Sequence, residues 1–572
     1  MTEKKIGAFI CRCGGNISDY VDVEQVREEI AREENVTVAE INMFSCSDAS
    51  QEDMIANIRE NGLDGIVIAS CSPKLHLNTF RAMAERAGLN PYQYIQVNIR
   101  EQCSWAHTHN KDAATRKAVS LVREGVAKAK LSEPLTPIEL TAQPSVMVIG
   151  AGLAGMRSAL ALGEMGVTVY LVEAAPEPGG SIKGRKSLFP DNSSGHELVE
   201  SLLERIRANG NIVLYTSAEI LEKTGSVGNF TIRIQVDGKN ETTLSVGAVI
   251  VSTGSGSYRP TDGEFGFGLS GVLTLNQYID MLDSSTDTLL LNGRKIRNIA
   301  YIYCVGSRQN GKEGNRYCSR YCCSAAVHTA VRTHEIDPSI GQFHFYRDIR
   351  TYGAYEELYH EALKKGSVFL KYGLKDPPQV TEVSGSGLRI RAADLLTGAE
   401  TMELETDLVV LVTGMVPGEN SQLIDILKLP VGKEGFFNEI HPKLRPVETV
   451  MDGIYIAGAC QGPKTLSESV ASGMAAVAKS ASLVLTGKVN LDPFVARVLT
   501  EKCTGCGECI SSCPYGAISM KETPDGTVVE ITESLCKGEG ACVAICNEEA
   551  LEIKGYGHNM IKAMIEALGG RR

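Results

Sequence analysis

The chain has 572 residues, of which 43% are apolar and 22% charged, and its formal net charge is −12. This length exceeds what one hydrophobic core organises, so it predicts three to five domains. The acidic balance argues against nucleic acid as a main partner. The most apolar runs, such as DLVVLVTGMV, are half as long as the roughly twenty residues that a membrane span needs. The first residues, MTEKKIGAFICRCGG, do not resemble an export signal, so we expect a cytoplasmic protein.

Seventeen cysteines are the most informative feature of the composition. Without an export signal, so many cysteines indicate metal or redox chemistry rather than structural disulfides. Five lie before residue 104, four between 304 and 323, one at 460 and seven between 503 and 546. Cysteines scattered through hydrophobic cores would not group in this way.

The N-terminal part, residues 1–132, is expected to be a small α/β domain. KKIGAFI and LDGIVIAS have the pattern of buried strands, and VDVEQVREEIAREE that of a charged helix. The following stretch, SEPLTPIELTAQP, contains three prolines and predicts a linker over 133–144. Beyond it, strands and helices alternate up to residue 488, as in a doubly wound fold.

The stretch SVMVIGAGLAGMRSALALGEMGVTVYLVE predicts a strand, a G-x-G-x-x-G turn, a helix and a second strand. Gly150 permits the tight turn, Gly152 lets the backbone approach a diphosphate, and Gly155 lets the helix pack on the strand. The diphosphate would lie at the helix N-terminus, where free N–H groups favour an anion. Glu173 follows the second strand, in the position that binds ribose hydroxyls.

FAD is favoured over NAD for three reasons. Two glycines, 179 and 180, follow the acidic residue, AVIVSTGS resembles the strand and turn that close an FAD domain, and GIYIAGACQGPKTLSESVASG resembles a late flavin motif. The residues expected to contact the FAD are Gly150, Gly152, Leu153, Ala154, Gly155, Glu173, Gly180, Thr253, Gly254, Gly458, Ala459 and Ser467. Cys460 lies in the late motif and is not expected to be a ligand.

A second nucleotide fingerprint is missing from the sequence where a disulfide-reductase-like flavoprotein would carry it. After the strand IRNIAYIYC the chain continues as CVGSRQNG, without G-x-G-x-x-G. We therefore expect an FAD domain in two parts, 145–290 and 401–488, with a vestigial NAD(P)H domain inserted over 291–400. Four cysteines follow in CVGSRQNGKEGNRYCSRYCC: Cys304, Cys318, Cys322 and Cys323. The pattern favours a 4Fe–4S cluster, with a reactive disulfide or a zinc site as alternatives.

The last part, 489–572, is expected to be a ferredoxin-like α+β domain that ends in a helix. CTGCGECISSCP matches the C-x2-C-x2-C-x3-C-P pattern at every position, and the second half, CKGEGACVAIC, has Glu539 where the second cysteine belongs. In two-cluster ferredoxins the fourth cysteine of each half serves the other cluster. The first site would then use Cys503, Cys506, Cys509 and Cys546, and the second Cys513, Cys536, Cys542 and Glu539. The second site could hold three irons, a fourth iron bound by the carboxylate, or nothing.

The whole chain resembles the HdrA-like iron–sulfur flavoproteins, which are the flavin-binding members of heterodisulfide reductase and related Hdr-type electron-transfer complexes. ICRCGGNISDYVDV, MFSCSDASQ, ASCSPKLHLNTFR and NIREQCSWAH are similar to the N-terminal domain of this family, and YCVGSRQ, YCSRYCC, FYRDIRTYG and GACQGPKTLSESVASG to its flavin-side segments. The resemblance implies that the middle cysteines ligate one 4Fe–4S cluster. It also implies an N-terminal cluster drawn from Cys11, Cys13, Cys46, Cys71 and Cys103, with Cys11 or Cys13 as the spare.

Function and partners follow from the same resemblance. It implies an FAD that splits or merges electron pairs between a two-electron donor, a disulfide-type acceptor and ferredoxin. It also implies a homodimer that works with subunits of the B and C type and with a hydrogenase- or formate-dehydrogenase-linked input subunit. His328 stands where relatives have a lysine beside the flavin, and a titrating histidine there would retune the flavin. The alternatives are a non-bifurcating Hdr-like relay and a stand-alone NAD(P)H-dependent disulfide reductase that uses Cys322 and Cys323.

Overall fold

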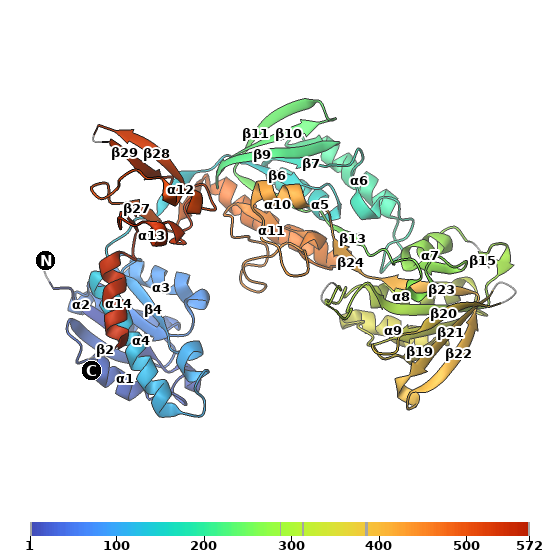
Figure 1. Cartoon of the computed structure of the whole chain (residues 1–572), viewed down its shortest axis with the longest axis horizontal. Helices are drawn as coiled ribbons and strands as arrows, with labels where there is room; N and C mark the ends of the chain where they lie inside the picture. The colour runs from blue at the N-terminus through green and yellow to red at the C-terminus, as the bar shows by residue number, and fades with distance from the viewer. Residues whose placement is uncertain (1–2, 286–287, 312–313, 384–386, 525, 570–572) are drawn as a thin grey trace. The chain divides into compact units, whose positions relative to one another are not determined.

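The computed structural model describes residues 3–285, 288–311, 314–383, 387–524 and 526–569. The chain divides into two units, one of residues 1–140 with 490–572 and the other of residues 141–489 (Figure 1). The chain leaves the first unit through β5 (Ile138–Thr141) and returns to it through β26 (Lys488–Leu491). The cysteines of the termini therefore belong to one unit, and the predicted flavin motifs and the middle cysteines belong to the other.

The N-terminal part of the first unit is a parallel sheet with the strand order β2–β1–β3–β4. The two central strands, β1 (Ile6–Cys11) and β3 (Gly65–Ser70), are buried along their whole length. Their continuous apolar sequences predict this, because a central parallel strand is covered on both faces. The outer strands are β2 (Val36–Asn42) and β4 (Tyr94–Asn98). The main helices are α1 (Val23–Ile30), α2 (Asp48–Asn61), α3 (Pro73–Ala87) and α4 (Lys111–Leu131).

The C-terminal part of this unit consists of two short antiparallel strand pairs and three helices. β27 (Ala496–Val498) pairs with β30 (Leu551–Ile553), and β28 (Ile518–Thr523) pairs with β29 (Gly526–Ile531). Each of the two short helices, α12 (Glu508–Ser512) and α13 (Ala541–Ile545), lies within one cysteine motif.

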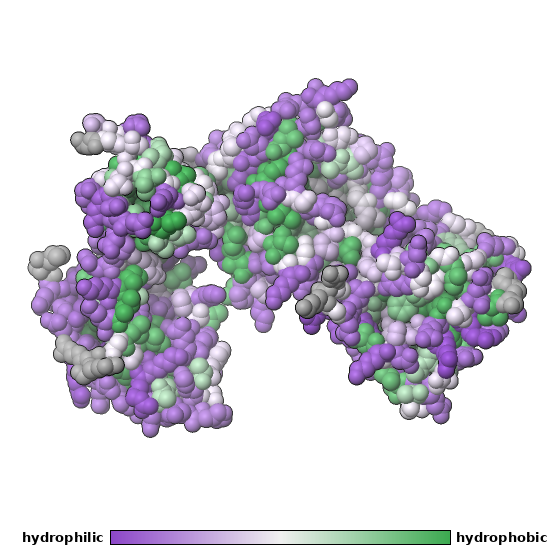
Figure 2. Space-filling model, viewed as in Figure 1, coloured by the Kyte–Doolittle hydropathy of each residue, from purple (hydrophilic) through white to green (hydrophobic). Residues whose placement is uncertain are grey.

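The last helix, α14 (His558–Gly569), packs along α4, as Figure 1 shows within this unit. The Nζ of Lys128 on α4 lies 3.4 Å from the ring centre of Tyr556, just before α14. Figure 2 shows an apolar strip over α14, where Ile561, Ile565 and Leu568 are exposed.

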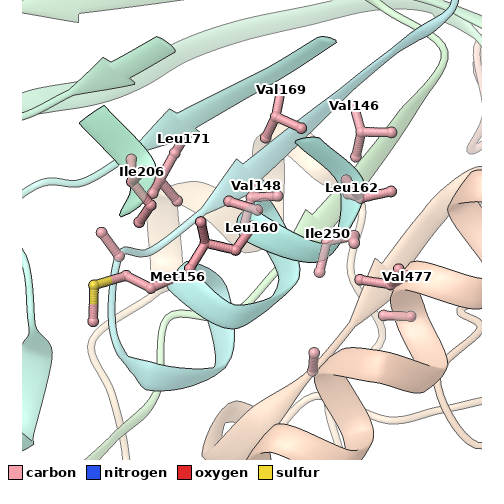
Figure 3. Close-up of a cluster of buried hydrophobic side chains, with 14 of the residues drawn as sticks. Val146, Val148, Met156, Leu160, Leu162, Val169, Leu171, Ile206, Ile250 and Val477 are labelled. Carbon is pink, nitrogen blue, oxygen red and sulfur yellow. The ribbon is translucent and has the colours of Figure 1, made fainter. Parts of the chain in front are cut away.

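The first sheet of the second unit is parallel and has the order β25–β12–β6–β7–β8. Its core fills the space between the sheet and the helices α5, α6 and α11, with Val146, Val148, Leu160 and Val169 among the buried side chains (Figure 3). The strands and helices are β6 (Ser145–Ile149), β7 (Thr168–Val172), β8 (Ile212–Tyr215), β12 (Ala248–Val251), β25 (Ile454–Ile456), α5 (Leu153–Glu164), α6 (Gly195–Ala208) and α11 (Leu466–Thr486). An antiparallel sheet of β9 (Ala218–Ser226), β10 (Asn229–Val236) and β11 (Asn240–Val246) belongs to the same half.

By length and composition alone, α11 is apolar enough to cross a membrane. In this fold it packs against α5, and a Cβ at Gly473 would lie 3.2 Å from the carbonyl oxygen of Ala154. Two helices approach this closely only where the contact residues are small. Packing against α5 and the first sheet buries part of this apolar surface.

The second sheet of this unit is also parallel, with the order β14–β23–β17–β18–β19. It includes β14 (Val272–Thr274) and β23 (Leu408–Thr413), which lie outside the expected range of 291–400. The domain in the fold is therefore wider than that range, because both strands hydrogen-bond in this sheet. Its other elements are β17 (Asn298–Val305), β18 (Gly341–Tyr346), β19 (Val368–Lys371), α7 (Leu275–Leu282), α8 (Cys322–Ile336), α9 (Glu356–Lys364), β20 (Gln379–Val383), β21 (Gly387–Asp394) and β22 (Glu400–Thr406). Short pieces complete the unit: β13 (Ser255–Ser257), β15 (Leu290–Leu291), β16 (Arg294–Lys295), β24 (Met415–Pro417) and α10 (Ser421–Leu427).

Candidate functional site

A cavity of about 570 Å³ lies at the carboxyl ends of β6, β7 and β12 in the second unit. This is the edge at which open parallel sheets bind nucleotides, and the volume lies within the range of cofactor pockets. Ten of the twelve residues expected at the FAD line it: Gly150, Gly152, Leu153, Ala154, Glu173, Gly180, Thr253, Gly254, Gly458 and Ala459. Gly155 lies beneath the turn, and the Ser467 hydroxyl pairs with Thr465 at the start of α11.

The glycines of the first motif are required by close backbone contacts. Gly150 has φ +98°, and a Cβ there would lie 2.6 Å from the carbonyl oxygen of Ser252. A Cβ at Gly155 would lie 1.8 Å from the carbonyl oxygen of Gly150. α5 starts at Leu153, and its N-cap is Gly152, which has no side chain to occupy the free N–H groups. The helix end is therefore open to an anion.

Two polar side chains in the cavity fit a nucleotide. The Glu173 carboxylate accepts hydrogen bonds from the backbone N–H groups of Ala151 at 2.6 Å and Ala175 at 2.9 Å, which fixes it at the end of β7. Among the described residues, the buried Thr253 hydroxyl has no protein partner and faces this cavity. A buried hydroxyl without a partner is costly, so it fits a site completed by a ligand.

The opposite wall of the cavity includes residues that the sequence did not single out. Glu419 and Asn420 come from the segment before α10, and Met415 comes from β24. Lys464 also lines the cavity, and burial lowers the pKa of its amine. No local motif marks Met415, Glu419 and Asn420, which the pairing of β24 with β13 brings to the cavity. Lys464 lies within the late flavin motif.

The four middle cysteines lie together at the carboxyl end of β17 and the start of α8. Cys304 lies in β17 and is buried, as are Cys322 and Cys323 in the first turn of α8. The Cys322 thiol donates a hydrogen bond to Cys323, which raises the pKa of Cys322 and lowers that of Cys323. The charge of Cys318 also raises the pKa of Cys322. The four sulfur atoms thus share one neighbourhood.

Arginines surround this cysteine group. Arg347 donates to the carbonyl oxygens of Ser307 at 2.9 Å and Arg308 at 2.7 Å, and Arg308 pairs with Asp348 at 2.7 Å. Burial raises the pKa of Cys304, and Arg347 opposes that effect. Soft thiolates among cations suit an iron–sulfur cluster, whose ligands are anionic.

The turn after β17, where a second nucleotide motif is missing from the sequence, packs against Tyr258. Gly306, directly after β17, has φ +69°, and a Cβ there would lie 1.9 Å from the ring of Tyr258. The next described helix, α8, begins only at Cys322. The strand, turn and helix N-terminus that would bind a diphosphate are therefore not adjacent here.

A short polar network joins the cysteine loop to the cavity. The Arg320 N–H donates to the Cys318 sulfur at 3.3 Å, and the Arg320 side chain pairs with Glu468 at 2.6 Å. The other oxygen of Glu468 accepts from the backbone N–H of Thr465, at the start of α11. Tyr352 donates to Glu468 at 3.1 Å. The loop that carries Cys318 is thus tied to a helix end that borders the cavity.

His328 is not among the described residues that line the cavity. It is buried on α8, with its ring edge-on to Phe189 and 5.4 Å from it between ring centres. Burial, together with Arg332, lowers its pKa to about 4. The helix position is the one expected, but the side chain packs against the segment before α6.

The N-terminal cysteines gather at the carboxyl edge of their sheet. Cys11 ends β1 and Cys71 follows β3. Burial raises the pKa of Cys71 to about 11, Arg100 opposes this, and Cys13 and Cys11 add to it. Arg100 approaches the Cys13 sulfur at 3.6 Å. Cys103 is fully buried in the same core as Cys11, whereas Cys46 packs against the core on the other face of the sheet.

The seven C-terminal cysteines fall into two neighbourhoods. Burial raises the pKa of Cys509 to about 11, and Cys506, Cys542 and Cys546 contribute. Burial also raises the pKa of Cys542, with contributions from Cys536 and Cys513. Cys503 packs on the same core. Cys546 thus lies near Cys509, and Cys513 lies near Cys542, while Cys542 also acts on Cys509.

All seventeen cysteines are free thiols. No three His, Cys, Asp or Glu side chains in the described part of the chain are arranged to hold a single metal ion. An iron–sulfur cluster contains several metal atoms, each with its own thiolate, so its ligands stand farther apart than those of one ion. Cysteine sulfur donors in groups of four or more fit iron–sulfur clusters better than single metal ions.

Two family matches cover these regions. Residues 144–309 match the family described as pyridine nucleotide-disulphide oxidoreductase, and residues 502–550 match the 4Fe–4S dicluster domain. They confirm the expected flavoprotein-type α/β fold and the expected ferredoxin-like segment. Among solved structures, the thioredoxin reductase of Lactococcus lactis matches 60% of this chain and 100% of its own, at 16% identity with a TM-score of 0.41.

Curated relatives align with nearly the whole chain. The second A-type iron–sulfur subunit of the CoB–CoM heterodisulfide reductase of Methanopyrus kandleri is 36% identical over 92% of this chain and 92% of its own length. The A-type subunit of the H2:CoB–CoM heterodisulfide,ferredoxin reductase of Methanothermobacter marburgensis is 34% identical over 91% of both chains. With identity of this level over this length, the chain belongs to the HdrA family of heterodisulfide reductase subunits, and it is a flavin and iron–sulfur electron-transfer oxidoreductase subunit.

Proposed function

We propose that the chain binds one FAD in the cavity of the second unit and up to four iron–sulfur clusters in its cysteine groups. The observation that carries this proposal is the position of the middle cysteines, whose loop is bonded through Arg320 to Glu468 in the first turn of α11, a helix that also lines the cavity. A buried cysteine group beside a flavin-sized cavity serves electron exchange between the two. The proposed place of work is the cytoplasm, whose reducing conditions suit a chain with seventeen cysteines, most of which would bind metal clusters.

The clusters would be held by four sets of side chains. The middle set is Cys304, Cys318, Cys322 and Cys323, and the N-terminal set is drawn from Cys11, Cys13, Cys46, Cys71 and Cys103. The two ferredoxin sets are Cys503, Cys506, Cys509 and Cys546, and Cys513, Cys536 and Cys542 with Glu539. Arg308 and Arg347 near the middle set, and Arg100 near the N-terminal one, offset the negative charge of the thiolates.

The residues of the cavity bind and orient the FAD. The open N-terminus of α5 holds the diphosphate, and Glu173 holds the ribose from the end of β7. The backbone of Gly458 and Ala459, with the start of α11, borders the ring end of the cavity. When bound, FAD accepts electrons in pairs and releases them singly.

The physiological reaction we propose is electron bifurcation, or its reverse, between a two-electron donor, a disulfide-type acceptor and ferredoxin. The printed name of the M. marburgensis relative, which joins H2, a heterodisulfide and ferredoxin, supports this choice. The proposed partners are Hdr-type B and C subunits, ferredoxin, and an input subunit linked to a hydrogenase or a formate dehydrogenase. The chain would work as a homodimer within this complex.

A second candidate is a relay that does not bifurcate. His328 favours it, because the ring is buried with a pKa lowered to about 4 and therefore supplies no fixed positive charge near neutral pH. A redox titration of the flavin distinguishes the two candidates. Bifurcation requires that the second one-electron potential lies above the first, whereas a relay has the opposite order.

Composition analysis of the anaerobically purified chain tests the proposal as a whole. We expect one FAD and roughly fifteen to sixteen iron atoms per chain. Replacement of Cys318 by Ala is expected to remove about four of those irons. The proposal would be contradicted if the iron content matched the ferredoxin segment alone and did not change in Cys318→Ala. That result would favour a disulfide reductase that uses Cys322 and Cys323.

A further inference from the structure

The second ferredoxin loop keeps the backbone of the first one although it has lost a cysteine. Gly505 and Gly507 flank Cys506 with φ +69° and +77°, and Gly538 and Gly540 flank Glu539 with φ +66° and +80°. Cys506 and Glu539 are both exposed, on matching loops that each lead into a short helix. Glu539 therefore occupies the place of a fourth ligand, with a longer side chain.

The turns that follow the two fourth cysteines are also alike. The Cys513 sulfur accepts from the N–H of Ala517 at 3.4 Å, and the Cys546 sulfur accepts from the N–H of Ala550 at 3.3 Å. Tyr515 lies two residues after Cys513, where the other turn has Glu548. The tyrosine is therefore present only at the site that has lost its cysteine.

The tyrosine and the glutamate meet at a small cavity. This cavity of about 30 Å³ is lined by Cys513, Cys536, Cys542, Glu539 and Tyr515. The Tyr515 hydroxyl donates to Oε1 of Glu539 at 2.6 Å. Tyr515 is half-buried and Glu539 is exposed.

A hydrogen bond of this length to a carboxylate is charge-assisted and strong. The hydrogen bond withdraws charge from the carboxylate and fixes its orientation, and both effects weaken it as a metal ligand. Three cysteine side chains line the same cavity. A fourth iron bound through the other oxygen, Oε2, would have to accept the orientation that Tyr515 sets.

We propose that Tyr515 holds Glu539 away from the fourth corner of the second ferredoxin site, so that this site takes a three-iron cluster on Cys513, Cys536 and Cys542. The inference rests on the proposed function, because it requires that the site binds a cluster. Tyr515 is a positioning residue in this account. The fourth corner then has no protein ligand and is open to an exchangeable divalent metal such as Fe²⁺.

The test is electron paramagnetic resonance (EPR) and iron analysis of the full-length protein, purified without air and oxidised mildly. The wild type is expected to give a three-iron signal close to one per chain. Tyr515→Phe frees the carboxylate, so the three-iron signal should fall at least fivefold with a gain of about one iron per chain. Tyr556→Phe is the matched control, because it removes a hydroxyl in the same unit and leaves the ring under Lys128. Tyr556→Phe should therefore leave the three-iron signal unchanged.

Two further variants separate the inference from the function on which it rests. The double variant Tyr515→Phe/Glu539→Ala should regain the three-iron signal, since the gain of iron requires the carboxylate. Glu539→Cys should convert the site to a four-iron cluster. The role of Tyr515 is overturned if the three-iron signal is unchanged in Tyr515→Phe. It is also overturned if the wild type has a full iron count but no three-iron signal. If neither the wild type nor Glu539→Cys holds a second ferredoxin cluster, the proposed function of this site is wrong, and the role of Tyr515 is not what failed.

Discussion

Cys460 is the one cysteine that lies outside the three groups. Its sulfur is buried and donates to the carbonyl oxygens of Ala457 at 3.1 Å and Val251 at 3.5 Å. It therefore joins the late flavin motif to β12. This side chain has a structural role that does not involve a metal.

We predict that Cys460→Ala leaves the iron content unchanged and lowers the melting temperature by about 1–2 °C. A small cavity and the lost hydrogen bonds destabilise by about 1 kcal/mol, which in a unit of this size corresponds to such a shift. Iron analysis and calorimetry of the same preparation measure both effects, with Cys318→Ala as the comparison that loses iron. A loss of iron in Cys460→Ala would refute the structural role.

At the residue scale, the glycine turn is the feature that the sequence predicts most directly, because a G-x-G-x-x-G spacing between a strand and a helix marks it. The contacts that require these residues come from farther along the chain, since Gly150 lies against Ser252 and Glu173 accepts from Ala151. Lys464 also lines the cavity, although the late flavin motif in which it lies does not indicate this contact. The position of His328 resembles that of a lysine beside the flavin, and in the fold its side chain packs against Phe189. A side-chain direction depends on packing that no local pattern encodes.

Among the elements, α8 carries a buried histidine that makes its unit sensitive to acid. The pKa of His328 is lowered to about 4 by burial first and by Arg332 second, while Asp191 and Glu361 oppose the shift. The unfolded chain has an ordinary value of about 6.5 and binds a proton there, which the folded chain does not. Stability is therefore full above pH 6.5 and is lost as the pH falls toward 4.

We predict that His328→Gln reduces the loss of stability of the second unit between pH 7 and pH 5 by an amount on the order of 1 kcal/mol. Melting curves at the two pH values measure it, with His334→Gln on the same helix as the control. A pH dependence that is the same in His328→Gln and in the wild type would mean that the ring is protonated in the folded unit. Some acid sensitivity should remain, because burial lowers the pKa of His344 to about 3 as well.

The bond between Arg320 and Glu468 connects two elements that carry different cofactors in the proposal. Both side chains are partly exposed, at 47% and 30%, so the pair is expected to contribute only about 0.5–1 kcal/mol. Its effect is local order rather than overall stability, because it fixes the loop of Cys318 against the start of α11.

We predict that Arg320→Gln raises deuterium uptake in two segments together, 314–321 and 463–469. Glu468→Gln should do the same, and the double variant should add little more, since both singles break one interaction. The pair Arg205–Glu164, with 2.7 Å between its atoms and similar exposure, is the control. Uptake that rises only in 314–321 would mean that the network does not join the two elements.

On the scale of the whole molecule, the order of strands and helices could be predicted, but their partners could not. The apolar runs of β1, β3, β6 and β12 predict buried strands, and each is buried along all or nearly all of its length. β14 and β23 also have strand-like sequences, yet their place in the second sheet depends on pairing with each other and with β17. Such pairing joins segments more than a hundred residues apart, and single-sequence periodicity carries no information about it.

The last prediction concerns how electrons enter the molecule. In the second domain, the turn after β17 is covered by the ring of Tyr258, and its carbonyl oxygens at Ser307 and Arg308 are bound by Arg347. The backbone N–H groups and the helix N-terminus that bind a diphosphate are not presented together there. Reduced nicotinamide nucleotides should therefore find no site from which to pass a hydride to the flavin.

We predict that NADH and NADPH do not bleach the flavin absorbance of the anaerobic protein, whereas dithionite bleaches it fully. Stopped-flow absorbance with each reductant in excess measures this, and Tyr258→Phe is the control that keeps the ring over Gly306. Rapid bleaching by a nicotinamide nucleotide would favour the disulfide reductase alternative. If only dithionite bleaches the flavin, the result favours electron entry through the cysteine groups over a nicotinamide-dependent reductase with an attached ferredoxin.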